Sequence, residues 1–218
     1  MLLGGDMKLV DLTIDEFLSE VDSPSPAPGG GSASALVSAL GVSLVRMVGH
    51  LSFGKKKFEG LDEGIKVEFK RRFQELKKIE EELKKLVDKD TESFNIFMAA
   101  MKMPKETEEE KKIRSVAMEE ATKKTIETPL KIAQLSSEVL HLLDYFVTYG
   151  NKNAISDVGV ATTLLYSGLE GAVMNIRVNL PNLSDEMLKA DLERKSFELK
   201  KRAKIIKSGL LEEVYNFL

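Results

Sequence analysis

One aspartate interrupts an apolar stripe near the middle of the chain. Asp90 occupies a position in the three- and four-residue spacing of one helix face, whose other members are Leu83, Val87, Phe94, Phe97 and Met101. A buried carboxylate without a partner costs several kcal/mol, so something must compensate for it. One interpretation is a buried partner such as a lysine, or a stripe that meets solvent there. The other is a carboxylate that faces a pocket, as a general acid or base or as an acceptor for a pair of substrate N–H groups.

A proline- and glycine-rich segment could form a second part of a site. The stretch "SPSPAPGGGSASALVSAL", residues 23–40, places Pro28, Gly29, Gly30, Gly31 and Ser32 directly before a run of small apolar residues. Glycine permits close backbone approach, and the free amides at a helix start can bind an anion or a carbonyl group. The alternative is a plain loop. The segment is not a P-loop, because it lacks the Gly-Lys-Ser/Thr ending.

Amides, a carboxylate and lysines provide the remaining candidates. Asn151, Asn153 and Asp157 crowd one predicted helix start, although Asp157 could simply favour the helix dipole. Asn175 lies inside an apolar helix, where a buried amide needs partners from another helix or from a ligand. The three lysines at 55–57 form either a solvated surface or a site that attracts a polyanionic substrate tail; Lys55 and Lys56 are the candidates for ligand contact.

Helical periodicity predicts the elements that position these residues. Thr13 and Glu16 form a capping box for a short helix ending near Glu20, and Ser32 is expected to cap a helix over 33–53. A long amphipathic helix is predicted over 62–103. A second capping box at Thr107 begins a helix over 107–127, and Pro129 is expected to kink or restart it before it continues to about 148.

Two further helices complete the prediction. Asn153 or Ser156 should cap a helix to about 179, and Ser184 should cap a last helix over 185–217. No segment shows the two-residue alternation of a strand. The predicted fold is therefore all-α, a single domain over 1–218 built as a multihelical array of long and short helices.

The predicted 62–103 helix is too long for a compact monomer. About 40 residues span ~60 Å, whereas a domain of this size is roughly 35–40 Å across. We expect the 62–127 segment to form a projecting α-hairpin that docks against a second subunit, and we expect a two-fold homodimer. The alternative is a bend that folds the helix back onto its own domain.

Composition excludes several classes of function. Apolar residues make up 43% of the chain and charged residues 31%, with a net charge of −3, so neither nucleic acid nor an anionic membrane is an expected partner. With no cysteine and two histidines, a metal site is not expected. The segment "MLLGGDMKLV" does not resemble a secretory signal, and the apolar stretch 33–53 falls short of a membrane span. A cytoplasmic location is expected.

Taken together, three segments resemble the cyclodeaminase/cyclohydrolase family of folate enzymes. They are "SPSPAPGGGSASALVSALGVSLVRMVGHLSFGKKKF" (23–58), "DKDTESFNIFMAAMKMP" (88–104) and "YGNKNAISDVGVATTLLYSGLEGAVMNIRVNL" (149–180). The resemblance implies an all-helical domain that dimerises, with a tetrahydrofolate derivative as substrate. It implies release of ammonia from 5-formiminotetrahydrofolate to give 5,10-methenyltetrahydrofolate, or hydrolysis of the methenyl compound.

For such chemistry, residue types suggest the roles. Asp90 or Asp157 would carry the proton, and the other would hold the amino-pyrimidine edge of the pterin. The 28–32 loop would form a backbone wall against the folate. The three asparagines would orient the bridge and the ring, and the lysines would meet glutamate carboxylates. A folate-binding protein without catalysis and a purely structural helical dimer stay open as alternatives.

Overall fold

The computed structural model describes residues 7–218, and all regular structure in this part of the chain is helical. Most of the amino-terminal segment analysed above for a secretory signal lies outside the described residues. The α-helices are α1 (Ile14–Val21), α2 (Gly30–Ser52), α3 (Lys56–Glu59), α4 (Glu63–Met101), α5 (Glu108–Leu142), α6 (Asp144–Tyr149), α7 (Ile155–Asn179) and α8 (Glu186–Tyr215). Three 3-10 turns are η1 (Leu9–Asp11), η2 (Lys152–Ala154) and η3 (Leu180–Asn182).

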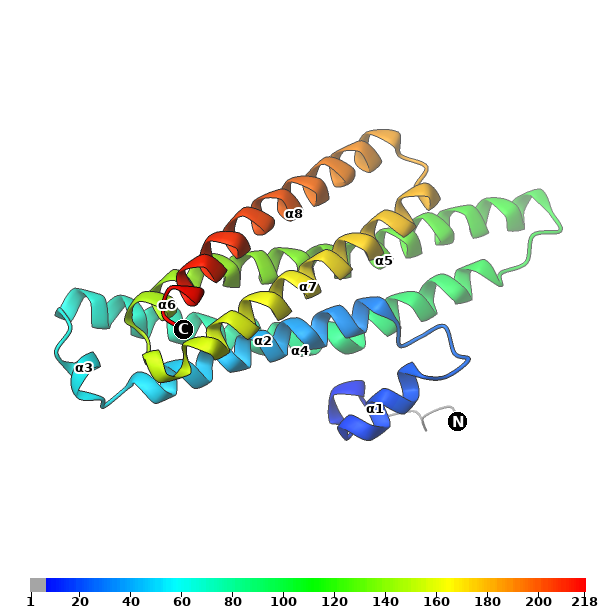
Figure 1. The fold of residues 1–218 in the computed structure, drawn as a ribbon. Helices are drawn as coiled ribbons and strands as arrows, with labels where there is room; N and C mark the ends of the chain where they lie inside the picture. The colour runs from blue at the N-terminus through cyan, green and yellow to red at the C-terminus, as the bar shows by residue number, and fades with distance from the viewer. Residues whose placement is uncertain (1–6) are drawn as a thin grey trace.

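The long helices run alongside one another in alternating directions (Figure 1). Helices α4 and α5 form an antiparallel hairpin, α2 and α7 pack against it, and α8 returns along α7. Their facing side chains form the core, whose largest fully buried members include Phe69, Phe146, Leu76, Leu165 and Leu169. The all-α prediction is confirmed.

Helices α2 and α7 approach closely because small residues line their contact. A Cβ on Gly168 would lie 2.0 Å from Ser38 Oγ, and a Cβ on Gly41 would lie 2.9 Å from Leu165 Cγ. Only glycine fits at such positions. By length and composition alone α2 could cross a membrane, but 56% of its most apolar window is buried inside the protein. Here α2 is a core helix between α4 and α7.

Some of the predicted helix N-caps are confirmed and others are wrong. The Thr13 and Thr107 capping boxes are present. The Ser32 cap is wrong: α2 begins earlier, with Gly29 at its N-cap, and the Ser32 hydroxyl donates instead to the Val87 carbonyl at 2.7 Å. At the other predicted caps, Ala154 rather than Asn153 or Ser156 precedes α7, and Asp185 rather than Ser184 caps α8.

Pro129 does not interrupt its helix, contrary to prediction. Helix α5 runs through it without a break, and the short α6 follows after Leu143. Proline lacks the N–H that would normally bond the carbonyl four residues earlier, here that of Thr125. Asn179 Nδ2 donates to that carbonyl at 3.5 Å. A side chain from α7 therefore replaces the missing donor.

The hairpin of α4 and α5 extends past the body of the protein (Figure 1). Ser32, near the start of α2, contacts Asp90, so the last eleven residues of α4 continue about 16 Å beyond that point. The predicted long helix over 62–103 is confirmed. Whether the hairpin contacts a second subunit stays a prediction.

Candidate functional site

The carboxylate of Asp90 lies against the start of α2. Its Oδ2 accepts a hydrogen bond from the Ser32 backbone N–H at 2.9 Å, and the Ser32 hydroxyl lies 3.4 Å away. A Cβ added to Gly31 would lie 2.0 Å from Asp90 Oδ1. Glycine at this position is therefore a requirement of the contact. The two segments that sequence analysis singled out separately, the glycine loop and the interrupted stripe, meet here.

The environment of Asp90 makes its carboxylate bind a proton more readily than an exposed aspartate does. Burial raises the pKa of Asp90 above its ordinary value, and the hydrogen bonds from Ser32 oppose that rise only in part. No lysine partner neutralises it within the part of the chain that the structure describes. Among residues 7–218, Oδ1 accepts no hydrogen bond, yet it is not sealed in the interior. Asp90 therefore presents one accessible oxygen that can take or give a proton.

Asn175 approaches the same helix start from α7. A Cβ on Gly30 would lie 3.1 Å from Asn175 Nδ2, which donates to the Gly171 carbonyl at 2.9 Å. Asn175 Oδ1 and the backbone N–H groups of Gly30 and Gly31 have no hydrogen-bond partner in the described residues. Together with Asp90, they offer two donors and two acceptors within a small region.

The remaining residues of the 28–32 loop have different surroundings. Pro28 is buried, Gly29 is half-buried and Gly30 is exposed. Ser32 is completely buried, with its hydroxyl on the Val87 carbonyl and 3.2 Å from Thr91 Oγ1. Ser32 thus contacts Asp90 on its buried side, while Gly29 and Gly30 form the accessible edge of the 28–32 loop.

The other candidates lie at the opposite end of the helices. Asn151 donates from its backbone N–H to Ser52 Oγ at the end of α2, and its side chain caps η2 by accepting from the Asn153 N–H. Asp157 follows in the first turn of α7. Along α7, Asp157 and Asn175 are about 27 Å apart. Within one chain, Asp90 and Asp157 therefore do not share a site.

A cavity of about 370 Å³ lies at this far end. Its lining consists of Ser52, Lys55, Lys57, Phe58, Tyr149, Gly150, Asn151, Lys152 and Asn153. Lys56 is not part of the lining. Sequence analysis missed Lys152, although its position between Asn151 and Asn153 could have indicated it. We call this cavity the lysine pocket.

The residues that line the lysine pocket carry positive charge and include no carboxylate. Among residues 7–218, none of Lys55, Lys57 and Lys152 forms an ion pair with a carboxylate. Burial and the nearby Lys57 lower the pKa of Lys152, and Glu213 partly opposes them. The Lys152 ammonium group donates to the Val147 carbonyl and lies 3.6 Å from the centre of the Phe217 ring. The pocket is suited to an anion.

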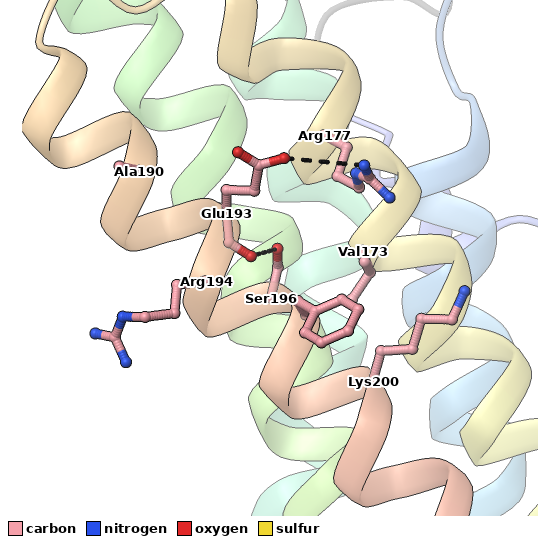
Figure 2. Close-up of a pocket in the computed structure, with 8 residues that line it drawn as sticks. Val173, Arg177, Ala190, Glu193, Arg194, Ser196 and Lys200 are labelled. Carbon is pink, nitrogen blue, oxygen red and sulfur yellow. Dashed lines mark hydrogen bonds and ion pairs between the residues drawn. The ribbon is translucent and has the colours of Figure 1, made fainter.

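A second cavity, of about 410 Å³, opens between α7 and α8 (Figure 2). Its charged residues are largely paired: Arg177 lies 3.9 Å from Glu193, and Lys200 lies 2.5 Å from Glu170. No sequence-predicted site residue lines it. Residues 7–218 contain no group of three or more histidine, aspartate or glutamate side chains that could hold a metal ion.

Comparison with known proteins assigns this helical chain to a class. The formiminotransferase-cyclodeaminase family model matches residues 13–198. The chain belongs to that family.

Its relatives in this family carry two activities in their names. The formimidoyltransferase-cyclodeaminase of Rattus norvegicus is 33% identical over 92% of this chain, which spans only 36% of that protein's length. The methenyltetrahydrofolate cyclohydrolase of Methylorubrum extorquens is 36% identical over 79% of this chain and 81% of its own. The crystal structure of formiminotetrahydrofolate cyclodeaminase from Thermotoga maritima superposes with a TM-score of 0.76 and 26% identity, covering 95% of this chain and 96% of that one.

Proposed function

We propose that this protein is a folate-dependent one-carbon enzyme that converts 5-formiminotetrahydrofolate to 5,10-methenyltetrahydrofolate with release of ammonia. The observation that carries the proposal is the partly buried Asp90, pressed against Gly31 with one oxygen accessible. The similarity to the Thermotoga maritima cyclodeaminase over nearly the full length of both chains supports it.

The proposed reaction requires one proton carrier. N10 of the folate attacks the carbon of the protonated formimino group. The N10–C bond forms, the C=N double bond becomes a single bond to an amino group, and the carbon becomes tetrahedral. Asp90, as carboxylate, accepts the proton released from N10. It then returns the proton to the amino group, whose C–N bond breaks as ammonia leaves. A carboxyl group with a raised pKa serves both steps, and such help contributes ~10²–10⁴-fold to the rate.

The groups around Asp90 would position the substrate. Gly29 and Gly30 form a low backbone edge that a flat pterin can approach, and the free N–H groups of Gly30 and Gly31 can bind its carbonyl group. Asn175 Oδ1 can accept from a pterin N–H. Holding N10 and the formimino carbon in contact contributes further to the rate. The reaction as proposed takes place in the cytoplasm and needs no metal.

A second candidate function is 5,10-methenyltetrahydrofolate cyclohydrolase. The relative from Methylorubrum extorquens, which bears that name and matches this chain over 81% of its own length, favours it. In that reaction water adds to the methenyl carbon, and Asp90 would take one proton of the water. It would pass that proton to the folate nitrogen whose C–N bond breaks, while the formyl C=O forms and the hydroxyl proton is released to solvent. The non-catalytic folate-binding protein is the remaining alternative.

One paired assay separates these candidates. The purified protein is supplied with 5-formimino- and then with 5,10-methenyltetrahydrofolate, and the absorbance of the methenyl chromophore is followed. We expect the absorbance to rise with the first substrate. Loss of absorbance with the second, and no change with the first, would indicate the cyclohydrolase instead. Binding without turnover of either would leave a folate-binding protein.

We also propose that the chain forms a homodimer and that the α4–α5 hairpin contributes to the contact. Exposed Ile113 and Val116, on the projecting part of α5, support this role. Sedimentation velocity should show a dimer, and Val116→Glu should weaken it. Ile205→Glu, which places the same charge on an exposed position of α8, is the matched control.

A further inference from the structure

Ser32 lies too deep to contact a ligand itself. We expected from the sequence that the whole 28–32 loop would line a folate, but Ser32 is completely buried, whereas Asp90 beside it is only partly buried. Both polar groups of Ser32 face α4: its backbone N–H donates to Asp90 Oδ2 at 2.9 Å, and its hydroxyl donates to the Val87 carbonyl. Any effect of Ser32 on a reaction must therefore act through Asp90.

The Ser32 hydroxyl has one hydrogen and three oxygen neighbours. Its Oγ lies 2.7 Å from the Val87 carbonyl oxygen, 3.2 Å from Thr91 Oγ1 and 3.4 Å from Asp90 Oδ2. Since these three residues are three and four positions apart, one turn of α4 surrounds the hydroxyl. The shortest of the three distances assigns the hydrogen to Val87. A hydroxyl donates one hydrogen bond, so it does not donate to Asp90 at the same time.

This arrangement suits a protonated Asp90 better than an ionised one. A hydroxyl that donates to a carboxylate lies about 2.5–2.7 Å from it, and the bond is roughly twice as strong as one between neutral groups. The Val87 carbonyl does not depend on Ser32, because inside α4 the Thr91 N–H also donates to it. The hydroxyl can therefore leave the Val87 carbonyl at little cost when charge develops on Asp90.

No charged group competes with Ser32 for this role. The groups that approach Asp90 and the neighbouring turns of α4 from other elements are uncharged: Gly31 and Ser32 of α2, Asn175 of α7 beside the same helix start, Thr128 of α5 on Ser93, and the Leu9 N–H of η1 on Asp88. Among the described residues, only burial and the Ser32 hydrogen bonds shift the pKa of Asp90.

We propose that Ser32 and Thr91 are positioning residues for proton transfer at Asp90, which keep Oδ2 as a hydrogen-bond acceptor so that the proton is taken up and released at Oδ1. The Ser32 hydroxyl turns from the Val87 carbonyl to Oδ2 when Asp90 is ionised, and it keeps its own proton. The Thr91 hydroxyl donates to Ser32 Oγ in that state and strengthens the bond to Asp90. Oδ1 accepts no hydrogen bond among residues 7–218 and is left for the substrate. The proposal rests on the proposed function for the identity of the reaction.

The titration of Asp90 tests the proposal without any activity. The chain is labelled with ¹³C at the side-chain carboxyl carbon of aspartate, and the Asp90 signal is the one that Asp90→Asn lacks. Ser32→Ala should raise the midpoint of its titration by about one pH unit, because a hydrogen bond to the carboxylate is lost. Thr91→Val should raise it by roughly 0.1–0.3 unit, and Thr91→Ser, which keeps the hydroxyl, should restore the wild-type midpoint. An unchanged midpoint in Ser32→Ala or in Thr91→Val overturns the proposal.

Ser136→Ala is the matched control. Ser136 is also completely buried, and its hydroxyl lies 2.8 Å from the Ile132 carbonyl oxygen of its own helix and 2.8 Å from Ser38 Oγ on α2. Removal of this hydroxyl should leave the Asp90 midpoint unchanged. A shift as large as that in Ser32→Ala would show a general change in the helix packing and would also overturn the proposal.

The pH dependence of kcat/KM links the positioning to the reaction. Asp90 must be a carboxylate when N10 attacks, so kcat/KM should fall as the pH drops through the pKa of Asp90. In Ser32→Ala this fall should move to higher pH by the same interval as the NMR midpoint, whereas a merely structural role would lower kcat without moving it. A fall that stays in place while the midpoint moves would overturn the role of Ser32 in the reaction. If the wild type turned over neither folate, the proposed function would fail, while the NMR titration would still decide whether Ser32 and Thr91 act on Asp90.

Discussion

The two ends of α2 place charged side chains in opposite surroundings, one buried and one open. At its start, the Asp90 carboxylate packs against Gly31, loses much of its hydration and, among residues 7–218, receives hydrogen bonds from Ser32 alone. At its end, Lys55, Lys57 and Lys152 line an open cavity whose lining contains no carboxylate, although Glu213 acts on Lys152. Burial shifts the pKa of a carboxyl group and so changes the pH at which it exchanges a proton, whereas exposed ammonium groups attract an anion. A group that carries a proton and a group that captures a ligand therefore need different surroundings.

The largest expected effect separates the two aspartates. Asp90→Asn keeps the shape of the side chain but cannot carry a proton, so we expect kcat to fall by ~10²–10⁴-fold. Asp157→Asn, at the far end, should leave kcat within about tenfold of wild type, because Asp157 would contact at most a substrate group away from the reacting bridge. Steady-state kinetics with the formimino substrate measures both. Equal losses in the two variants would contradict the comparison.

The next effect concerns the contact between Gly31 and Asp90. In Gly31→Ala the new methyl group would collide with the carboxylate, so Asp90 or the loop must move. We expect a loss of roughly 1–3 kcal/mol in the free energy of unfolding, together with reduced kcat. Gly209→Ala is the control, since a Cβ there meets nothing within 4 Å and alanine should stabilise the helix by up to about 1 kcal/mol. Urea unfolding compares the two variants.

A smaller effect should distinguish the lysine pocket by its salt dependence. Lys55→Ala/Lys57→Ala should raise KM about tenfold at low ionic strength. The difference in KM between variant and wild type should shrink at high salt, because salt screens the Lys55 and Lys57 charges of the wild type. The kcat of this variant should change little, and Lys201→Ala/Lys204→Ala should behave as wild type. A loss of kcat that is independent of salt would instead place these lysines beside the reacting atoms.

The smallest effect is a gain in stability. Folding raises the pKa of Asp90, so this group favours the folded state most at low pH, and that contribution is lost as the pH rises through the raised pKa. Asp90→Asn removes the cost of burying the charge. We expect its Tm to exceed that of the wild type by a few degrees, roughly 2–4 °C per kcal/mol, at neutral pH. The difference should disappear below about pH 4, where the carboxyl is protonated in both states. Thermal melts across this range provide the check.

Periodicity predicted the long helices because their buried faces are built from regularly spaced apolar residues. The capping boxes at Thr13 and Thr107 were equally readable, since all their contacts lie within four residues. The predicted cap at Ser32 and the predicted break at Pro129 were wrong for the same reason. Each depends on a partner distant in sequence, the Val87 carbonyl for Ser32 and the Asn179 amide for the helix around Pro129.

In the candidate site, too, local features could be predicted from the sequence and long-range contacts could not. Asp90 was identifiable as a polar residue in an apolar stripe, and the glycine run was identifiable as a special loop. That they touch follows from the antiparallel register of α2 and α4, which no local pattern contains. The asparagines near 151 were grouped with Asp90 by residue type alone, and the chain places them at the far end.

The tight crossing of α2 and α7 has a consequence for how a substrate could enter. Gly168 leaves no room for even a methyl group against Ser38, and Gly171 leaves none against Ser34. Moving the two helices apart would expose the Ser34 and Ser38 side chains, whose hydroxyl groups donate to carbonyls within α2 and pack against the glycines of α7. A substrate would therefore reach Asp90 at the exposed start of α2, beside Gly30, and not between α2 and α7.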